Sequence, residues 1–404
     1  MSHLGHEVLC ADIDADKVDS LNNGLVPIVE PGLESLLCEG LSNGRLKFVL
    51  GARNAVKNAE FVFLCLPTPQ SESGEADLSF LKHATSEIAT DLTTNSIVIN
   101  KSTVPVGSTH LVREILCRND VSVISNPEFL REGSAISDFL QPDRIVIGCD
   151  DQTDVIRVSE LYKGIDAPIV ATDPASSELI KYASNAFLAT KLSFVNAIAT
   201  LCEMVGADIN EVTKGVGHDR RIGHDFLRPG PGWGGSCFPK DSAALLHLAN
   251  SHGYKFELMR SVIIENEQQF DRIAEKILSS SNNVNRVAVW GLTFKALTDD
   301  LRDSPSLEII HRLLEKGIEI IAFDPTVEAK QQSKFGFKVA ESAIDCARGA
   351  DVLAVLTEWQ EFCTVDPHQV RELMNGTVVV DARNLLESEK WVAAGFKYVG
   401  LGRH

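Results

Sequence analysis

Short apolar runs alternate with amphipathic stretches at both ends of this 404-residue chain. In the first third the runs are residues 7–12, 61–66, 96–100, 121–125 and 144–148. In the last third they are residues 286–290, 318–324, 351–356 and 377–381, with a helical pattern at 306–316. Runs that are apolar almost throughout and are separated by helices indicate a parallel sheet buried on both faces. The alternation therefore predicts an α/β fold with a doubly wound sheet at each end of the chain.

The middle of the chain is predicted to be helical. Asp173 and Pro174 fit the cap and first residue of a helix whose pattern continues to about Gly206. More helix follows, with a glycine-rich break at residues 228–235 and a polar linker at 279–285. We therefore expect three domains, namely a first sheet domain (1–170), a helical domain (171–275) and a second sheet domain (276–404).

Composition narrows the possible partners. The formal net charge of -18 disfavours nucleic acid and anionic membranes, because like charges repel. The nine cysteines form no CxxC pair, which is typical of reduced thiols in the cytoplasm and favours neither disulfides nor a metal site. No uninterrupted apolar run reaches the roughly 20 residues of a membrane span. An anionic substrate would need a local cluster of Arg and Lys.

The front of the chain fits part of a dinucleotide-binding domain. Such a domain starts with a strand, a G-x-G-x-x-G turn and a helix, and an acidic residue follows about 20 residues later. Asp12 fits this acidic residue, although an acidic turn residue at a strand end is about as common. Counting back about 20 residues from Asp12 passes residue 1, and no G-x-G-x-x-G follows another predicted strand. We therefore expect a domain that lacks its first strand and glycine turn.

Cys237 is the strongest candidate for a nucleophile. It lies in the glycine-rich loop 230–241, which leads into a helical pattern at Ser242. A helix N-terminus and the neighbouring Lys240 both favour a thiolate. A single cysteine is more often a buried, inert thiol, and only its loop distinguishes Cys237 from the other eight.

Other polar groups admit two interpretations. Lys181 and Asn185 share a face of the long helix and could hold an oxyanion, or could form a solvated polar stripe. Glu128 and Glu132 follow a strand, at the edge where parallel sheets bind ligands, and could relay protons or be ordinary loop carboxylates.

The loop after the first strand of the last domain is also ambiguous. Phe294, Lys295 and residues 299–305 could cradle a nucleotide or could simply begin a capped helix. This loop lacks the glycine pattern of a pyrophosphate site.

In order along the chain, ten segments resemble the UDP-glucose 6-dehydrogenases of the UDP-glucose/GDP-mannose dehydrogenase family. The resemblance runs from Gly5 to Arg403. The segments are LGHEVLCADID (residues 4–14), PTPQ, KSTVPVGST, NPEFLREGSAI, ELIKYASNAFLATKLSFVNAI, RRIG, PGPGWGGSCFPKD, GLTFK, DDLRDSPS and DAR. The resemblance implies that residues 1–170 bind NAD, 171–275 form a dimer interface and 276–404 bind a UDP-sugar. The family begins with a strand and glycine loop that this chain does not contain.

The resemblance also implies a reaction. NAD would oxidise the C6 alcohol of UDP-glucose twice, giving UDP-glucuronate for polysaccharide biosynthesis. Cys237 would capture the intermediate aldehyde as a thiohemiacetal, because a carbonyl carbon must become tetrahedral before it can give up a hydride. Oxidation then gives a thioester, which water hydrolyses.

The resemblance assigns a role to individual residues. Cys237 is the nucleophile, Lys181 and Asn185 hold oxygens at C6, Asp241 helps to activate water, Glu128 is the acid/base, and Thr103 lies beside the nicotinamide and the catalytic water. Substrate contacts are Phe129, Leu130, Arg131, Glu132, Arg228, Pro229, Gly230, Pro231, Gly232, Trp233, Gly234, Phe294, Lys295 and Arg383, with Arg221 reaching the substrate of the other subunit. Cofactor contacts are Asp12, Lys17, Leu66, Pro67, Thr68, Pro69, Gln70, Ser102, Thr103, Val104, Glu132, Lys240 and Arg302.

Two alternatives stay open. One is a relative that acts on GDP-mannose or UDP-N-acetylmannosamine; the latter enzymes usually have GGHC and no Lys before the Asp, which Ser236, Lys240 and Asp241 argue against. The other is a non-catalytic protein that binds a nucleotide sugar but, lacking the pyrophosphate loop, does not bind NAD. Binding of UDP-sugar without binding of NAD would favour the second alternative.

Overall fold

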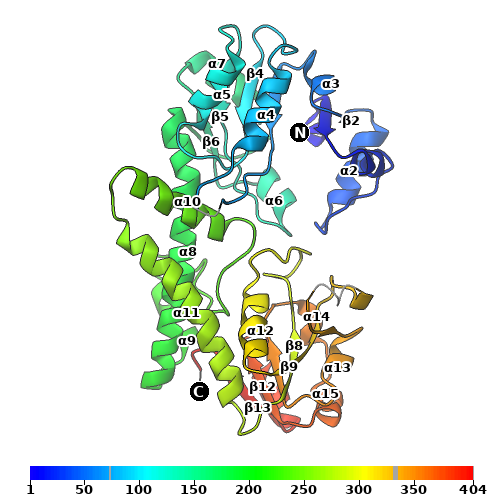
Figure 1. Ribbon diagram of the computed structural model, residues 1–404, viewed down its shortest axis with the longest axis vertical. Coiled ribbons are helices and arrows are strands. Elements are labelled where there is room, and N and C mark those ends of the chain that lie inside the picture. The colour runs from blue at the N-terminus through cyan, green and yellow to red at the C-terminus, as the bar shows by residue number, and fades with distance from the viewer. Residues whose placement is uncertain (72–73, 331–334, 404) are drawn as a thin grey trace. The chain divides into compact units, whose positions relative to one another are not determined.

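The computed structural model describes residues 1–71, 74–330 and 335–403. It divides into two compact units. The first unit comprises Met1–Ser184 and Ala243–Gly253, and the second comprises Asn185–Ser242 and Tyr254–His404. Helices α8 (Pro174–Val205) and α10 (Phe238–Ser251) contribute residues to both units (Figure 1).

A five-stranded sheet forms the centre of the first unit. Its order is β3-β4-β5-β6-β7, with β3 (Phe61–Leu64), β4 (Ile97–Asn100), β5 (Ser122–Ser125), β6 (Ile145–Gly148) and β7 (Ile169–Thr172). The expectation of an entirely parallel sheet is wrong at one step, because β5 and β6 pair antiparallel through Ser125 and Gly148. The connection between these strands, residues 126–144 with α6 (Ala135–Leu140) in it, is long enough for a parallel crossover, so its length does not account for the antiparallel pairing.

The front of this unit forms a separate sheet. In the described part of the chain, β1 (Val8–Asp12) pairs in parallel with β2 (Leu46–Leu50) and with no other strand. The helices around these two sheets are η1 (Ser2–Leu4, 3-10), α1 (Ala15–Asn22), α2 (Leu33–Ser42), α3 (Arg53–Val56), α4 (Ser79–Ile88), α5 (Ser108–Leu116) and α7 (Gln152–Glu160).

The five-stranded sheet is covered on both faces, as its apolar strands predict. On β4, Val98 packs in one cluster with Val112 of α5, whereas Ile97 and Ile99 pack in another cluster with Val158 of α7. Successive side chains of a strand point to opposite faces, so a strand buried on both sides is apolar at every position.

Helix α8 begins as the sequence predicts. The Asp173 carboxylate accepts hydrogen bonds from the backbone N–H (2.8 Å) and hydroxyl (2.6 Å) of Ser176. One turn later the buried Glu178 carboxylate accepts from Gly107 N (2.7 Å), Thr109 N (2.8 Å) and the Thr109 hydroxyl (2.7 Å). Because these donors open α5, Glu178 caps that helix and joins α8 to the sheet.

The second unit combines helices with a six-stranded parallel sheet. The helices α9 (Ile209–Gly217) and α11 (Glu257–Ser279) precede the sheet, whose order is β10-β9-β8-β11-β12-β13. Its strands are β8 (Arg286–Trp290), β9 (Glu319–Phe323), β10 (Lys338–Val339), β11 (Val352–Val355), β12 (Val378–Asp381) and β13 (Lys397–Gly400). Its helices are α12 (Pro305–Glu315), α13 (Ala343–Cys346), α14 (Gln360–Cys363), α15 (Pro367–Leu373) and α16 (Ser388–Ala393).

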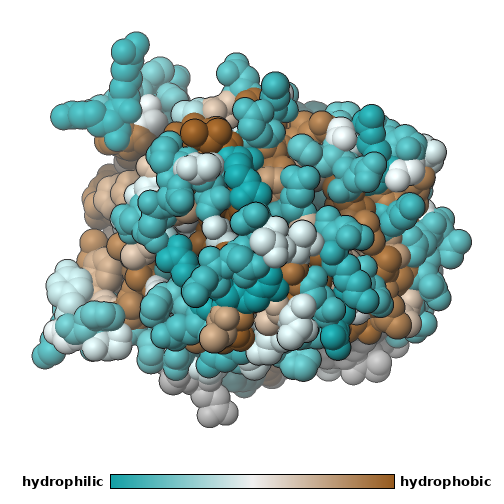
Figure 2. All heavy atoms as spheres, turned by 90° about the horizontal axis from the view of Figure 1, so that it is seen from above, coloured by the Kyte–Doolittle hydropathy of each residue, from teal (hydrophilic) through white to brown (hydrophobic). Residues whose placement is uncertain are grey.

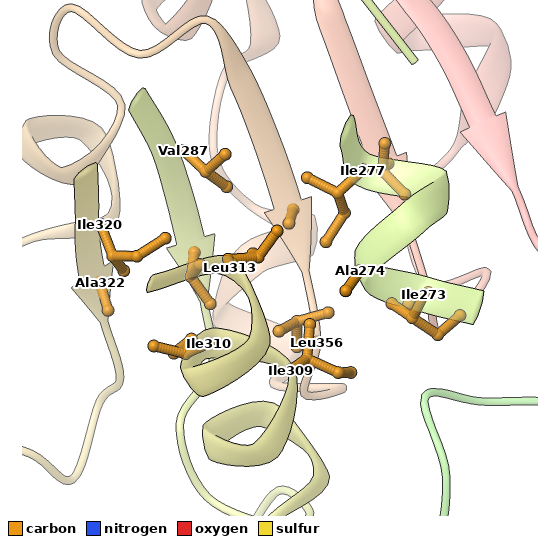
Figure 3. Packing of buried hydrophobic residues seen from close by; sticks show 14 of the residues in the cluster. Ile273, Ala274, Ile277, Val287, Ile309, Ile310, Leu313, Ile320, Ala322 and Leu356 are labelled. Carbon is orange, nitrogen blue, oxygen red and sulfur yellow. The ribbon is translucent and has the colours of Figure 1, made fainter. Parts of the chain in front are cut away.

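Each face of this sheet has its own core. Figure 3 shows Ile273 and Ile277 of α11 and Ile310 of α12 gathered near Val287 of β8. On the opposite face, Trp290 stacks on Phe362 with ring centroids 5.1 Å apart. A sheet domain at each end and a helical middle agree with the predicted architecture, although the strands of the first domain form two sheets, β1-β2 and β3-β4-β5-β6-β7. The sequence did not predict β2, β7, β10 or β13.

Shortening a side chain in the core of the second unit is expected to destabilise it. Ile310→Ala removes a fully buried side chain, and the cavity should cost about 2–5 kcal/mol of unfolding free energy, measured by urea denaturation. Val392→Ala is the control, because Val392 is 56% exposed and should cost less than about 0.5 kcal/mol. Equal losses would show that the core is not where we place it.

Candidate active site

Cys237 stands at the start of α10, as predicted. It is the residue before the helix, and its carbonyl accepts the backbone N–H of Asp241 at 2.9 Å. The thiol is partly exposed and lies 3.6 Å from the Ser236 hydroxyl. A helix N-terminus carries partial positive charge and so favours an anion at this position.

Asp241 links the catalytic candidates of the second unit. The side chain is 1% exposed. Its two carboxylate oxygens accept hydrogen bonds from the Asn185 amide (2.6 Å) and the Lys240 ammonium (2.6 Å). Because Asp241 lies in the first turn of α10, these contacts bring Asn185 of α8 to the turn that carries Cys237.

The glycine-rich loop before Cys237 is held by side chains of α8 and α11. Asn196 accepts the backbone N–H of Gly230 (2.8 Å), and Gln269 donates to the Gly230 carbonyl (2.8 Å). Asn266 both accepts from Trp233 N (2.8 Å) and donates to its carbonyl (2.9 Å). The two helices therefore bind the backbone of this loop, and the buried Trp233 side chain adds a hydrogen bond from its indole N–H to the Ser193 hydroxyl of α8 (2.9 Å).

Two glycines of this loop are required by close packing. A Cβ on Gly234 would lie 1.8 Å from the backbone oxygen of Asp303. Gly232 has a φ of +132°, and a Cβ there would lie 2.4 Å from the Phe270 ring. Any side chain at these positions would move the loop away from its supports.

Glu128 and Lys181 form an ion pair in the first unit. Their charged groups are 3.1 Å apart, and the Lys181 side chain is only 4% exposed. The second carboxylate oxygen of Glu128 accepts Leu130 N at 2.6 Å. Phe129 lies under two cations, with the Arg144 guanidinium 3.7 Å and the Lys181 ammonium 5.2 Å from its ring centroid. The loop after β5 is therefore attached to α8.

Helix α8 carries both Lys181, which pairs with Glu128, and Asn185, which binds Asp241. Lys181 belongs to the first unit and Asn185 to the second, and they lie one turn apart on one continuous helix.

The predicted cofactor loops are connected by hydroxyl groups. The Ser102 hydroxyl accepts Leu66 N (2.6 Å) and contacts the carbonyl of Leu66 (2.8 Å). The Thr68 hydroxyl donates to the Thr103 carbonyl at 2.9 Å. The loops after β3 and β4 thus lie side by side at the carboxyl ends of their strands, although the Ser102 hydroxyl is already engaged by backbone.

Asp12 and Lys17 meet at the end of β1. The Lys17 ammonium donates to Asp12 at 2.6 Å, and this hydrogen bond holds the pKa of the Asp12 carboxyl below its usual value. A partly exposed carboxylate beside a cation suits the polar end of a nucleotide.

Several predicted arginines are engaged within the protein. Arg383 donates to the carbonyls of Leu356 (2.9 Å) and Phe294 (3.0 Å). Exposed Arg221 and Arg302 pair with neighbouring carboxylates, and Arg131 pairs with Asp138. These contacts fix where the guanidinium groups lie; their substrate and cofactor roles stay predictions.

Sequence reasoning missed several supporting residues. Glu178 and Tyr162 received no role, and Lys101 and Asn126 were quoted only inside longer motifs. Adjacency to predicted strand ends was the available signal for Lys101 and Asn126. Among the described residues, no group of three or more His, Cys, Asp or Glu side chains could hold a metal ion.

Comparison with known proteins identifies one family along the chain. Models of the UDP-glucose/GDP-mannose dehydrogenase family match residues 1–166 (NAD binding domain), 175–268 (central domain) and 288–388 (UDP binding domain). The UDP-glucose 6-dehydrogenase TuaD of Bacillus subtilis (strain 168) is 41% identical, over 100% of this chain and 89% of that protein. The UDP-glucose 6-dehydrogenase of Rhizobium meliloti (strain 1021) is 40% identical, over 99% and 95%.

The fold has a close counterpart among solved structures. A UDP-glucose dehydrogenase from the hyperthermophilic archaeon Pyrobaculum islandicum superposes with a TM-score of 0.91 at 35% identity, covering 100% of this chain and 94% of that one.

The close packing of Gly234 predicts a large effect of a single methyl group. Gly234→Ala should lower the unfolding free energy by about 3 kcal/mol or more, because the methyl group meets a backbone oxygen that cannot move alone. Thermal unfolding measures this. Gly215→Ala is the control: Gly215 faces open space in α9, and alanine there should stabilise by up to about 1 kcal/mol. A Gly234→Ala protein as stable as the wild type would contradict the loop packing.

Proposed function

Because the chain belongs to the UDP-glucose/GDP-mannose dehydrogenase family and is an NAD-dependent dehydrogenase, we propose that it oxidises UDP-glucose twice at C6 to UDP-glucuronate. The main support is the arrangement at the start of α10, where a partly exposed thiol lies in one turn with a buried carboxylate that binds an amide and an ammonium. The names of relatives about 40% identical over nearly the whole chain support UDP-glucose as the substrate.

The residues at the strand ends fit NAD. The Asp12 oxygens can accept ribose hydroxyls, and the paired loops after β3 and β4 offer backbone groups along a ligand. We propose that Asp12, Lys17 and residues 66–70 and 102–104 hold the cofactor, with Glu132, Lys240 and Arg302. Bound NAD supplies the acceptor for each hydride.

Cys237 is proposed to carry the covalent chemistry. Its thiolate attacks the C6 aldehyde, the carbon–sulfur bond forms, and the carbonyl oxygen takes up a proton to give the thiohemiacetal. Loss of a hydride and the hydroxyl proton leaves a thioester. Water then adds to the thioester carbon and the carbon–sulfur bond breaks, which releases the carboxylate and restores the thiolate.

Five further side chains have complementary proposed roles. Asp241 accepts the proton of the attacking water, and Glu128 exchanges protons with the substrate. One N–H of Asn185 binds Asp241, and its amide has a second N–H that can be directed at a C6 oxygen. Lys181 supplies a cation for the same oxygen. Thr103 stands beside the nicotinamide.

Substrate binding is assigned to three loops. Residues 129–132, residues 228–234 and the group of Phe294, Lys295 and Arg383 are proposed to hold the sugar and the UDP. The matched UDP binding domain, residues 288–388, contains Phe294, Lys295 and Arg383 and supports their part of this assignment. The names of the relatives favour neither GDP-mannose, UDP-N-acetylmannosamine nor a non-catalytic role.

A homodimer is proposed to form along α8. Phe187, Phe194 and Leu201 recur at intervals of seven residues and therefore lie on one face of the helix. They are 65%, 56% and 50% exposed. A second copy of the chain would cover this stripe, and the nearby loop with Arg221 could then reach the other subunit's substrate. We keep the division into domains 1–170, 171–275 and 276–404 as part of this proposal.

The protein is proposed to be soluble and cytoplasmic, without nucleic-acid or membrane partners. Figure 2 shows a face on which hydrophilic side chains predominate, in keeping with the net charge of -18. Among the described helices, α8 alone has the length and composition of a membrane span. Its buried Glu178 and Lys181, and the cap that Glu178 gives to α5, support the proposal that α8 is a structural helix of the fold.

The proposed mechanism predicts two NADH per UDP-glucose and dependence on one thiol. Cys237→Ser should reduce NADH formation by about 10³-fold or more, because a serine hydroxyl is a far weaker nucleophile near neutral pH. Absorbance at saturating NAD measures the rate and the stoichiometry.

Cys363→Ser is the matched control, since this exposed thiol contacts only the Leu385 carbonyl among the described residues. It should keep wild-type activity. Two NADH per sugar from Cys237→Ser would refute the covalent mechanism, and faster turnover of GDP-mannose than of UDP-glucose would refute the substrate.

The proposed dimer depends on the apolar stripe of α8. Phe194→Glu places a charge in its middle and should shift the protein from dimer to monomer in sedimentation velocity, whereas exposed Val392→Glu should not. A monomeric wild type would exclude the interface.

A further inference from the structure

A lysine ammonium lies among polar groups at the end of β4. Lys101 follows Asn100 directly, and its ammonium donates to the Asn126 side-chain oxygen (3.0 Å) and the Tyr162 hydroxyl (3.3 Å). It also lies 5.7 Å from the centroid of the Tyr162 ring. Lys101 has no carboxylate at ion-pair distance among the described residues, and its hydrogen bonds are with Asn126 and Tyr162.

Asn126 receives these contacts at the point where β5 ends. It is 1% exposed. Its backbone N–H continues the sheet to Asn100 (2.9 Å), and its side-chain amide donates to the Val146 carbonyl of β6 (2.7 Å). The same side-chain oxygen accepts the Tyr162 hydroxyl as well as Lys101. The Asn126 side chain is thus held from β4, from β6 and from the segment after α7.

Glu128, the proposed acid/base, lies two residues after Asn126. Pro127 restricts Asn126 to extended backbone, and Glu128 is the next residue, paired with Lys181 at 3.1 Å. A displacement of Asn126 is therefore transmitted to the Glu128 carboxylate through a single stiff proline.

We propose that Lys101, together with Tyr162, is a positioning residue that fixes Asn126 and thereby holds Glu128 in the geometry needed for proton transfer. This inference rests on the role of Glu128 in the proposed function. Lys101 acts through Asn126 and is not assigned a contact with the reacting atoms.

The electrostatic cost of Lys101 argues against a purely stabilising role. Burial lowers the pKa of its ammonium to about 8; Cys65 and Glu128 oppose this shift and Lys181 adds to it. The folded protein therefore binds the Lys101 proton less tightly than the unfolded chain does. Removing a charge from water costs free energy that a hydroxyl and an amide oxygen repay only in part, so an apolar side chain of similar length is expected to be tolerated at this position.

The test compares Lys101→Met with Lys163→Met in the full chain. Lys163 is 83% exposed and contacts only Glu160 among the described residues. Lys101→Met should lower kcat about 10- to 100-fold, the scale of a displacement near 1 Å, and change KM for UDP-glucose less than about threefold. Its Tm should equal or exceed that of the wild type. Lys163→Met should leave kcat, KM and Tm unchanged.

The pH dependence of stability separates the electrostatic cost of Lys101 to folding from its effect on catalysis. Below about pH 8 the buried charge opposes folding, and the penalty is relieved as pH rises from about 8 towards the ordinary lysine pKa of 10.5. The Tm advantage of Lys101→Met should therefore be greatest below pH 8 and shrink above it. A Tm of Lys101→Met well below the wild type at pH 7 would overturn the inference in favour of a structural role.

A double-mutant cycle with Glu128→Gln shows whether Lys101 acts through Glu128. If it does, Lys101→Met should lower kcat less than about threefold in the Glu128→Gln background. Additive losses, or wild-type kcat in Lys101→Met, would overturn the inference. Tyr162→Phe, which removes one hydroxyl and keeps the ring, gives a second cycle with Glu128→Gln and should show the same non-additive loss of kcat.

Failure of the proposed function can be distinguished from failure of the Lys101 inference. If the proposed function is wrong, the wild type forms no NADH from UDP-glucose, or Glu128→Gln is as fast as the wild type. Failure of the Lys101 inference alone leaves an active wild type, a slow Glu128→Gln and a normal Lys101→Met.

Discussion

The Asp241 carboxylate is the group on which the arrangement around Cys237 depends. A charge removed from water is tolerated only when its oxygens are bound, and Asp241 satisfies both of its oxygens at 2.6 Å through Asn185 and Lys240. The same bonds attach the first turn of α10 to α8. The need to pair one buried charge thus determines where the thiol stands.

The backbone of the neighbouring loop is held in a similar way. Side-chain amides of Asn196, Asn266 and Gln269 replace the hydrogen bonds that the loop 230–233 would otherwise make with water. Amides offer donors and acceptors without charge, so they fix this loop without adding a cation or a carboxylate beside it. The glycines then allow the loop to approach Asp303 and Phe270 closely.

Sequence alone predicted most of the strands that are apolar almost throughout, as well as the long helix. The pattern for α8 placed its ends within about a residue, and the run 286–290 matches β8. It missed β7, whose residues are mostly exposed, and β2, where Lys47 interrupts the apolar run. The catalytic candidates were found because they lie in distinctive motifs, whereas the contact of Glu128 with Lys181 joins residues far apart in sequence and follows only from the fold. Glu178 was missed because nothing local shows that a helix carboxylate will cap another helix.

The first unit is discontinuous in sequence, since it is completed by Ala243–Gly253 after the chain has passed through residues 185–242 of the second. A ribosome that has made Ser184 must therefore extend the chain to Gly253 before that unit can close. At about 5–20 residues per second the wait is roughly 3–14 s. During this time the surfaces that will receive the end of α10 stay open, and the second unit, which extends to His404, can close only after a still longer stretch of synthesis.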